Sequence, residues 1–525
     1  MKITKFIILT MALLTALHVH TQEVKAQEAN AIEKYDLCVI GAGPAGYAAT
    51  MRAIDFGKKV LLVEKGKVGG AGIHNGALTS KTWRELSKQA DEIFKQAKIL
   101  NIAIPTFNFK ALKAEVDLAV KEREELLYHN MDNINLRLKG DLFFFKRGVA
   151  RLIEVTPTRR VEITTQKGKE VIEASHVILA TGSRPRNVSN IEVDDKVILT
   201  SDSIESLTAF PKSIVIVGAG VIGCEYATIF ANFKETKVFL IDKGERILPF
   251  EDEDVVKVIE SDLETRGVVI HRNATLKELK KEGDEVVYTL EYKGGKKETF
   301  RVEKALLSIG RVPNVEGIVS QELGLKLKSG AVDAPTTETN LEGVYAIGDL
   351  TADTALVNVG ELEGRFAVES IFSTPKRPLV YENISMVMFF PTEVAGIGLN
   401  ETDAKAKGLN YKVATVDYKC LARATSMRNT IGFIKIIVTD DDEMKVLGAR
   451  IIGREASSAI EGLALLIYMN HGIAALAEMI HPHPAITEGV QECARIFQGT
   501  SILKPQVLPE HMSAKRYKNG RYENL

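Results

Sequence analysis

Two glycine-rich turns have the residue types and the spacing that bind a dinucleotide. Each reads Gly-x-Gly-x-x-Gly, as GAGPAG from residue 41 and as GAGVIG from residue 218. In such a turn the first glycine allows a sharp bend, the second lets a pyrophosphate approach the backbone, and the third lets the next helix pack on the strand. The glycines in these positions are Gly41, Gly43 and Gly46 in the first turn and Gly218, Gly220 and Gly223 in the second.

An acidic residue follows each turn at the end of the next apolar run, Glu64 in the first case and Asp242 in the second. A carboxylate at this place accepts hydrogen bonds from a ribose diol and repels a 2′-phosphate. One glycine turn alone is weak support, because such turns are common. Two complete units favour two adenine dinucleotides over the alternative of two nucleotide-binding folds without a ligand.

The segments that position these residues repeat one pattern. Residues 35–66 and 213–244 each contain an apolar run, a glycine turn, a small-residue helix and a second apolar run, which predicts two βαβ units. Further buried strands are expected in 177–186 and 344–350, and helices in 92–140. From about residue 385 the pattern changes to strand-like runs followed by an apolar helix over 456–471.

Composition indicates a globular protein of two to four domains. The chain has 525 residues, of which 45% are hydrophobic and 26% charged. Its 68 basic and 69 acidic residues give a formal charge of −1, so we expect small molecules or other subunits as partners and no nucleic acid. The cysteines have neither disulfide-scaffold nor metal-ligand spacing, and we expect buried free thiols and no metal site. They are Cys38, Cys224, Cys420 and Cys493.

The first residues resemble a secretory signal peptide. Lys2 and Lys5 precede the apolar stretch FIILTMALLTAL, and Val24 and Ala26 are suitable small residues before a cleavage site. We therefore predict a signal peptide over 1–26 and a periplasmic or secreted protein. The alternative is an uncleaved segment, which would leave the protein cytoplasmic or anchored to a membrane. No other segment approaches the length of a membrane span.

Taken together, the motifs resemble the flavin-dependent pyridine nucleotide-disulfide oxidoreductases over roughly residues 33–505. They occur in that family's order as GAGPAG, GG then SK, ATGSRPR, GAGVIGCE, SIGRVPN, VYAIGD and HPHPAITE. The resemblance implies an α/β homodimer with two Rossmann-like FAD- and NAD(P)-binding domains and an α+β C-terminal dimerisation domain. The expected segments are an FAD-binding first half (33–190), an NAD(P)-binding domain (191–315), an FAD-binding second half (316–384), an interface domain (385–505) and a flexible tail (506–525).

The resemblance also assigns cofactors to residues. The first turn would bind FAD together with Glu64 and Asp349, and the second would bind NAD(H) together with Asp242. Gly70, Gly182 and Gly310 are further expected cofactor-binding residues. Lys243 and Arg246 leave NADP(H) open as an alternative. Lys81 matches a lysine that the family places near flavin N5. In the family this lysine pairs with a glutamate, which corresponds to Glu225. A cation at that place stabilises the negative charge of reduced flavin.

The sequence departs from the family where its disulfide reductases have two cysteines. Between Gly70 and Ser80 those positions hold Gly72 and Ala77, which have no redox chemistry, so disulfide reduction by a dithiol is excluded. The soluble pyridine nucleotide transhydrogenases have also lost the pair, and the spacing of His74 and Gly76 is similar to theirs. Two roles are equally open for His74: filling space beside the flavin, or taking part in the reaction.

A late motif is similar instead to the disulfide reductases. His483 and Glu488 match a histidine base and its orienting glutamate, which the transhydrogenases generally lack. The pair is a candidate general acid or base, and an inherited packing role is the alternative. We expect an FAD-dependent NAD(P)H oxidoreductase that passes electrons to a second nicotinamide, a quinone or a similar acceptor. The alternative is a flavin-binding or scaffold protein that has lost catalysis.

Overall fold

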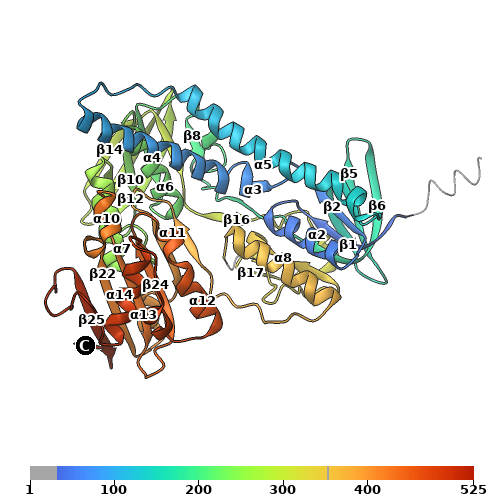
Figure 1. The fold of residues 1–525 in the computed structure, drawn as a ribbon. Helices are drawn as coiled ribbons and strands as arrows, with labels where there is room; N and C mark the ends of the chain where they lie inside the picture. Colours follow the sequence, from blue (N-terminus) through green and yellow to red (C-terminus); the bar gives the residue numbers. More distant parts are fainter. Residues whose placement is uncertain (1–31, 352–353) are drawn as a thin grey trace, which may run out of the picture. The chain divides into compact units, whose positions relative to one another are not determined.

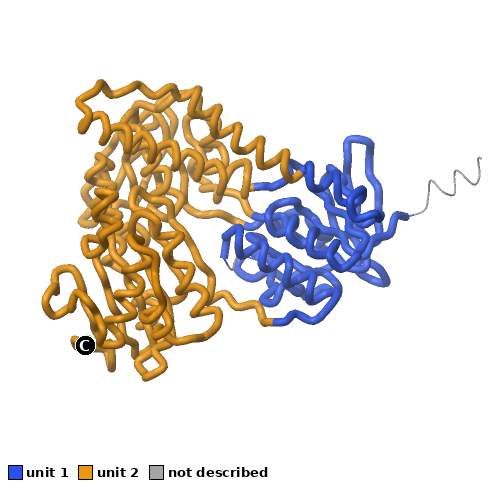
Figure 2. Tube along the Cα trace, in the orientation of Figure 1, with its two compact units in different colours: residues 1–70, 128–182, 313–376 blue, residues 71–127, 183–312, 377–525 orange. Residues whose placement is uncertain are grey.

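The computed structural model describes residues 32–351 and 354–525, which form two compact units (Figure 2). Unit 1 contains the residues up to 70 together with 128–182 and 313–376. Unit 2 contains 71–127, 183–312 and 377–525. The predicted signal peptide over 1–26 lies outside the described residues.

Unit 1 is built on a seven-stranded sheet in the order β3-β2-β1-β6-β5-β4, with β19 also paired to β6. Its central strands are almost continuously apolar and buried, as expected for parallel strands with both faces covered. The pair that β4 forms with β5 is antiparallel. The strands are β1 (Lys34–Ile40), β2 (Val60–Glu64), β3 (Phe143–Arg147), β4 (Val149–Glu154), β5 (Arg159–Thr165), β6 (Gly168–Leu179) and β19 (Val344–Ala346).

Two helices of unit 1 pack closely because glycines remove the side chains between them. The helices are α2 (Pro44–Asp55) and α8 (Val357–Phe372), which lie side by side in Figure 1. A Cβ on Gly364 would lie 2.4 Å from the carbonyl oxygen of Ala45, so only glycine allows this approach. The contact fixes α2, the helix that follows the first glycine turn.

Unit 2 contains the long helix α4, the part of α5 up to residue 127, and a parallel sheet. The sheet has the order β11-β10-β9-β15-β8. The segment between β11 and β15 forms a separate antiparallel sheet of β12, β13 and β14. Its helices are α4 (Ala77–Leu100), α6 (Val221–Phe233) and α7 (Glu253–Thr265). Helix α5 (Phe109–Leu138) follows α4. The strands are β8 (Ile198–Thr200), β9 (Ser213–Val217), β10 (Lys237–Ile241), β11 (Val269–His271), β12 (Ala274–Glu282), β13 (Glu285–Tyr292), β14 (Lys297–Val302) and β15 (Lys304–Leu307).

Helix α4 packs against α6, and this contact assigns residues 71–127 to unit 2. Trp83 and Ala90 of α4 share one buried cluster with Phe230 and Phe233 of α6. The predicted first half of the FAD-binding domain, 33–190, therefore divides between the two units. The sequence pattern does not reveal this division, because the apolar face of α4 does not identify the helix that covers it.

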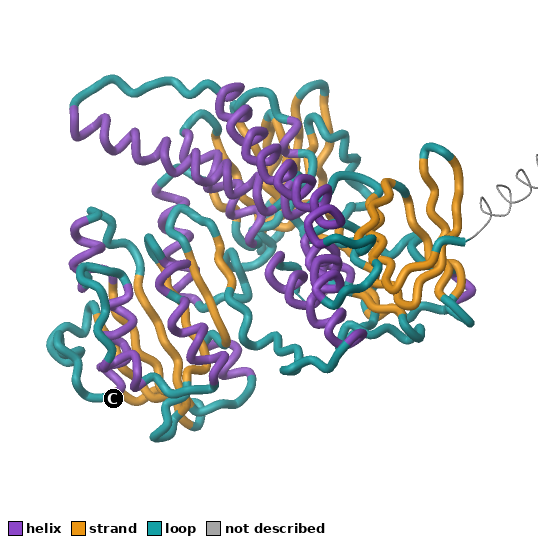
Figure 3. The backbone as a smooth tube through the Cα atoms, turned by 45° about the vertical axis from the view of Figure 1, so that its right-hand side comes forward, coloured by secondary structure: helices purple, strands orange, loops and turns teal. Residues whose placement is uncertain are grey.

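The C-terminal part of unit 2 is a seven-stranded antiparallel sheet in the order β20-β21-β24-β23-β22-β25-β26. Helices lie along one face of this sheet in Figure 3, and they share a buried core with it. The strands are β20 (Met386–Met388), β21 (Val394–Gly398), β22 (Tyr411–Asp417), β23 (Phe433–Thr439), β24 (Val446–Ile452), β25 (Met512–Lys518) and β26 (Arg521–Asn524). The helices are α9 (Glu401–Ala406), α10 (Ala422–Ser426), α11 (Ala456–Ala459), α12 (Glu461–Met469), α13 (Ala474–Glu478) and α14 (Thr487–Phe497).

The last residues differ from the expected flexible tail over 506–525. Strand β25 pairs with β22 from Tyr411 to Val416, and β26 pairs with β25. Met512 is buried in the core, and Tyr517 stacks on Tyr411 with ring centroids 5.1 Å apart. The polar composition suggested a loose tail, but β25 completes the sheet, and Met512 and Tyr517, five residues apart, pack on opposite faces of it.

The remaining elements are short. Among the described residues, no helix combines the length and the apolar character needed to cross a membrane. The short elements are α3 (Gly70–Ile73), β7 (Ser183–Pro185), β16 (Arg311–Pro313), β17 (Leu327–Lys328), β18 (Ala331–Val332), and 3₁₀ turns over Ile204–Ser206, Gln321–Leu323, Gly348–Leu350 and Tyr418–Cys420.

Candidate functional site

In the first glycine turn, which lies in unit 1, the backbone conformation and packing restrict Gly41 and Gly46 to glycine but not Gly43. Gly41 has φ +109°, and a Cβ on Gly46 would lie 1.9 Å from the Gly41 carbonyl oxygen, so both positions need glycine. Gly43 has an ordinary φ of −69°, and a Cβ there would meet no atom within 4 Å. Glu64 accepts a hydrogen bond of 2.7 Å from the Ala42 N–H. The open space at Gly43 fits a bound phosphate.

The second turn, in unit 2, repeats this arrangement. Gly218 has φ +102°, and a Cβ on Gly223 would lie 2.0 Å from the Gly218 carbonyl oxygen. Gly220 has φ −79°, and a Cβ on it would have no neighbour within 4 Å. Asp242 accepts hydrogen bonds from the Ala219 N–H at 3.3 Å and from the Gly244 N–H at 2.7 Å. Both turns therefore leave space at the second glycine.

The helices that follow the turns have N-termini without a side-chain cap. Gly43 and Gly220 are the N-cap residues of α2 and α6, and neither helix receives a capping hydrogen bond from a side chain. The first N–H groups of a helix need acceptors, and a phosphate supplies them in the favourable direction of the helix dipole. The residues present thus fit two dinucleotides.

The other predicted cofactor-binding residues of unit 1 lie at turns. Gly70 begins α3 with φ +48°, and a Cβ on it would lie 3.2 Å from the Cα of Gly43. Gly182 has φ +67°, and its carbonyl accepts a hydrogen bond of 2.9 Å from the Asn314 N–H. Asp349 is half-buried in the 3₁₀ turn Gly348–Leu350. Gly70 is therefore in direct contact with the open glycine of the first turn.

Gly310, predicted as a cofactor-binding residue, lies in unit 2 with φ +100°. Its carbonyl accepts a hydrogen bond of 3.0 Å from the Arg186 N–H. Next to it, Arg311 donates to Ser183 at 2.8 Å and to Asp202 at 2.7 Å. These bonds hold β7 and β16 together, so Gly310 has a fixed backbone conformation.

Lys81 and Glu225 form the ion pair that the resemblance implies. The Lys81 ammonium lies 3.0 Å from Glu225 Oε2, and the other carboxylate oxygen accepts a hydrogen bond of 3.1 Å from the Phe389 N–H. The Phe389 ring lies 5.3 Å from the same ammonium. The Glu225 side chain is 6% exposed, whereas that of Lys81 is 34% exposed. Glu225 is thus a buried anchor for a partly exposed cation.

The segment that lacks cysteines forms the junction between α3 and α4. Gly72 lies in α3, and Ala77 is the first residue of α4. A Cβ on Gly76 would lie 2.3 Å from the carbonyl oxygen of Ala71, so the turn between the helices is tight.

No cysteine elsewhere supplies a reactive thiolate. Cys38, Cys224 and Cys493 are buried and free, and Cys420 is half-buried. Burial raises the pKa of the Cys38 thiol to about 12 and raises the pKa of the other three above the ordinary value as well. These thiols therefore remain protonated at neutral pH.

His483 and Glu488 form the predicted pair near the start of α14. His483 Nδ1 lies 2.8 Å from Glu488 Oε1, and the other carboxylate oxygen accepts the Ala485 N–H at 2.9 Å. Burial acts to raise the pKa of Glu488, but the hydrogen bonds from Ala485 and His483 outweigh it and lower the pKa below its usual value. The His483 side chain is 70% exposed, so it is available to a molecule outside this chain.

Sequence reasoning missed two pairs that lie far apart in the chain. His74 Nε2 lies 3.7 Å from Glu124 Oε1 of α5. Trp83 donates a hydrogen bond of 3.1 Å to Glu205, and burial raises the pKa of this carboxyl. His74 was identifiable as a candidate residue, but no sequence signal indicated Glu124 as its partner.

A third cluster is formed around Lys435 in β23. The Lys435 ammonium lies 2.8 Å from Asp252, 2.8 Å from Asp254 and 3.2 Å from Glu401. Burial acts to lower the pKa of Lys435, but the three carboxylates outweigh it and raise the pKa. This cluster connects the start of α7 with the C-terminal sheet within unit 2.

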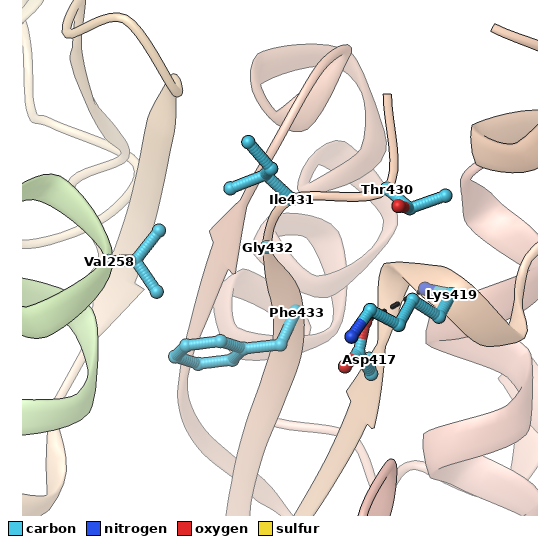
Figure 4. A pocket seen from close by; sticks show the side chains of 7 residues that line it. All are labelled: Val258, Asp417, Lys419, Thr430, Ile431, Gly432 and Phe433. Atoms are coloured by element: carbon cyan, nitrogen blue, oxygen red, sulfur yellow. Dashed lines mark hydrogen bonds between the residues drawn. The ribbon is translucent and has the colours of Figure 1, made fainter. Parts of the chain in front are cut away.

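Figure 4 shows a surface depression elsewhere in unit 2, lined by Val258 of α7, by the ends of β22 and β23, and by residues of the segment that connects these two strands. None of the lining residues is a predicted site residue. They are Val258, Asp417, Lys419, Thr430, Ile431, Gly432 and Phe433.

Comparison with known proteins determines the family. A family described as pyridine nucleotide-disulphide oxidoreductase matches residues 35–366, and the dimerisation domain of the same family matches 384–494. The chain belongs to the pyridine nucleotide-disulphide oxidoreductases. A dihydrolipoyl dehydrogenase of Bacillus subtilis is 31% identical over 482 residues, which cover 89% of this chain and 99% of the relative. One from Geobacillus stearothermophilus is 31% identical over 468 residues, covering 88% and 96% respectively.

Solved structures have the same fold. LpdA from Mycobacterium tuberculosis matches with a TM-score of 0.79 and 25% identity, and the match covers 89% of this chain and 100% of LpdA. The HOCl-induced flavoprotein disulfide reductase RclA from Escherichia coli matches with a TM-score of 0.77 and 21% identity, covering 89% and 100%. The predicted family and α/β fold class are confirmed. The chain is an FAD-dependent oxidoreductase of this family, and its cofactors are FAD and NAD(H).

Proposed function

We propose that this oxidoreductase takes hydride from NAD(P)H and passes electrons from its flavin to a non-disulfide acceptor, either a second nicotinamide or a quinone. The observation that carries the proposal is the presence of Gly72 and Ala77 where the family's disulfide reductases have cysteines. Neither residue forms a mixed disulfide. The four thiols of the chain do not replace them, because burial disfavours each thiolate.

Bound FAD would supply the two-electron store that links the donor and the acceptor. The open spaces at Gly43 and Gly220 would accommodate the two pyrophosphates. Lys81, held by the buried carboxylate of Glu225, would stabilise negative charge that develops on the reduced cofactor. Asp242 would favour NADH over NADPH, because a carboxylate repels a 2′-phosphate.

We also propose a homodimer that forms through the dimerisation domain, residues 384–494. His483 and Glu488 belong to this domain, and the exposure of His483 supports a role toward a partner subunit. Export through residues 1–26 remains a proposal supported by the sequence pattern alone. Mass measurement of the mature N-terminus tests it, since a chain beginning near Gln27 is expected and an intact Met1 would contradict export.

The test of function is stopped-flow reduction of the purified holoprotein followed by a panel of acceptors. NADH should bleach the flavin, and the reduced protein should be reoxidised by a quinone such as menadione or by thionicotinamide-NAD⁺. Lipoamide and glutathione disulfide should give no turnover. Lipoamide turnover of about 10 s⁻¹, an ordinary enzymatic rate, would refute the proposal. A protein that binds FAD but reacts with neither NADH nor any acceptor would be the flavin-binding scaffold instead.

A further inference from the structure

The end of α4 and the loop that joins it to α5 expose a group of aliphatic side chains in unit 2 (Figure 1). Residues 99–105 read ILNIAIP, and every one of them is exposed. We call these residues the hairpin tip. Its large aliphatic members are Ile99 (73% exposed), Leu100 (61%), Ile102 (59%) and Ile104 (59%). Single apolar residues are common on protein surfaces, but a contiguous apolar group of this kind marks a binding surface.

The base of the loop is well packed. Phe107 packs edge-to-face on Phe94 of α4 and on Phe233 of α6, with ring centroids 5.5 Å apart in each pair. At the other end of the loop, the Ile102 N–H donates a hydrogen bond of 3.1 Å to the Ala97 carbonyl of α4. The aromatic residues of this segment are therefore anchored in the core of unit 2, while its aliphatic residues remain in contact with solvent.

Lysines flank the hairpin tip on both sides. Between Glu92 and Glu115 the chain has four lysines and no acidic residue. They are Lys95, Lys98, Lys110 and Lys113. The outer two form ion pairs within their own helices. Lys98 and Lys110 are exposed, and neither forms an ion pair with any residue that the structure describes. The tip is thus locally cationic, although the whole chain has a formal charge of −1.

We propose that the hairpin tip binds the surface of an anionic lipid bilayer. The aliphatic side chains enter the boundary between headgroups and acyl chains, and Lys98 and Lys110 contact the anionic headgroups. The composition favours a membrane over a protein partner, because protein interfaces are enriched in aromatic residues and arginine and depleted in lysine. Membrane binding goes beyond the proposed function and is independent of the acceptor that the flavin reduces.

Flotation of the holoprotein with lipid vesicles tests this binding. Wild type should bind vesicles of equal parts phosphatidylcholine and phosphatidylglycerol, and should bind phosphatidylcholine alone at least about 10-fold more weakly. The double variant Ile102→Asn, Ile104→Asn should weaken binding to the anionic vesicles by about 100-fold, because two apolar side chains no longer enter the membrane. The double variant Lys98→Gln, Lys110→Gln should weaken it by roughly 10-fold and reduce its dependence on salt.

Two control variants alter exposed residues of unit 2 outside the hairpin tip. Leu118→Asn, Leu126→Asn changes two leucines of α5 that are 46% and 53% exposed. Lys293→Gln, Lys297→Gln removes two exposed lysines at the turn between β13 and β14. Both controls should bind the anionic vesicles within about 2-fold of wild type. An unchanged melting temperature and flavin content show that each variant has folded.

A tryptophan in the hairpin tip reports its contact with lipid directly. The chain contains one tryptophan, Trp83, which is buried. The emission of Ile102→Trp should shift to shorter wavelength when the anionic vesicles are added and should be quenched by brominated lipid. Wild type and Leu118→Trp should show neither change. This measurement is specific for the tip, whichever other part of the chain also contacts the vesicle.

Three results would overturn the membrane assignment. One is tryptophan emission at position 102 that brominated lipid does not quench. Another is binding to the anionic vesicles that both tip variants leave unchanged. The third is self-association of the chain that Ile102→Asn, Ile104→Asn abolishes without any vesicle binding, which would assign the tip to a contact between copies. The acceptor panel tests the proposed function separately, so failure of one leaves the other standing.

Discussion

The Lys81 ammonium lies 3.0 Å from the buried carboxylate of Glu225. Replacing Lys81 by Met removes the positive charge that would stabilise a reduced cofactor, and we expect flavin reduction by NADH to slow by about 10-fold or more. Stopped-flow absorbance measures this rate. Lys88→Met is the matched control, because Lys88 lies on the same helix and is also 34% exposed. Equal rates of flavin reduction in wild type and Lys81→Met would show that Lys81 does not stabilise the reduced cofactor.

The two glycines Gly43 and Gly46 should respond differently to alanine. Gly43→Ala should leave the stability of the apoprotein within about 0.5 kcal/mol of wild type but prevent FAD binding, because its Cβ enters the space for the phosphate. Gly46→Ala should destabilise the protein by about 1–3 kcal/mol, because its Cβ meets the Gly41 carbonyl. Denaturant unfolding and FAD titration distinguish these effects. FAD binding by Gly43→Ala at wild-type affinity would contradict the phosphate assignment.

The absence of the cysteine pair has a spectroscopic consequence. Two-electron reduction of the wild type should bleach the flavin without the long-wavelength absorption that a thiolate beside flavin produces. The double variant Gly72→Cys, Ala77→Cys should gain this absorption, and the corresponding double serine variant should not. A long-wavelength band in the reduced wild type would reveal a thiol that the structure does not place there.

Asp242 is expected to set the preference between the nicotinamide cofactors. Asp242→Ser removes the charge that repels a 2′-phosphate, so the ratio of kcat/KM for NADH over NADPH should fall roughly 10-fold, or about 1.4 kcal/mol. Steady-state reduction of an artificial acceptor with each nicotinamide cofactor measures this ratio. Glu245→Gln, at an exposed acid nearby, should leave the ratio unchanged. A wild type that prefers NADPH would make the assignment of Asp242 wrong.

The buried Lys435 cluster predicts a stability that depends on pH. Burial acts to raise the pKa of Asp252, but Lys435 outweighs it and lowers the pKa to about 2. The stabilisation by Asp252 is thus complete above its unfolded pKa of 3.8 and is lost as pH falls toward about 2. Lys435→Met should cost about 3–5 kcal/mol at pH 7, because it leaves buried carboxylates unpaired.

Denaturant unfolding of Lys435→Met at pH 7 and pH 3 measures this dependence. The difference between variant and wild type should shrink at pH 3, where protonation relieves the carboxylates. Lys412→Met on the neighbouring strand is the control, because Lys412 donates only to the Asp441 carbonyl in an exposed position. A difference that stays constant with pH would contradict the ionic origin of the stabilisation.

Short, local patterns in the sequence were sufficient to predict the two glycine turns and the helices that follow them. A glycine turn and its acid lie within one βαβ unit, so the sequence alone assigns Gly41 to Glu64 and Gly218 to Asp242 to these sites. The position of Lys81 opposite Glu225 followed only from the family resemblance, because the two residues are far apart in sequence.

The parts that were not predicted depend on contacts between distant segments. Lys435 lies in the apolar strand FIKIIVT, where a single lysine indicates an unusual position, but its partners on α7 and α9 are not identifiable from that strand. The same holds for Glu124 beside His74. The C-terminal hairpin was missed because its strands are mostly polar, and Met512 is the buried side chain of β25.

The position of β25 also affects how the C-terminal sheet is completed during synthesis. Strand β22, at Tyr411–Asp417, is made well before its neighbour β25, at Met512–Lys518. Until the later residues leave the ribosome, one edge of β22 has unpaired N–H and C=O groups, and open edges of this kind promote association between chains. The final hairpin closes that edge, so removing residues 512–525 should produce a protein that aggregates while it is being translated.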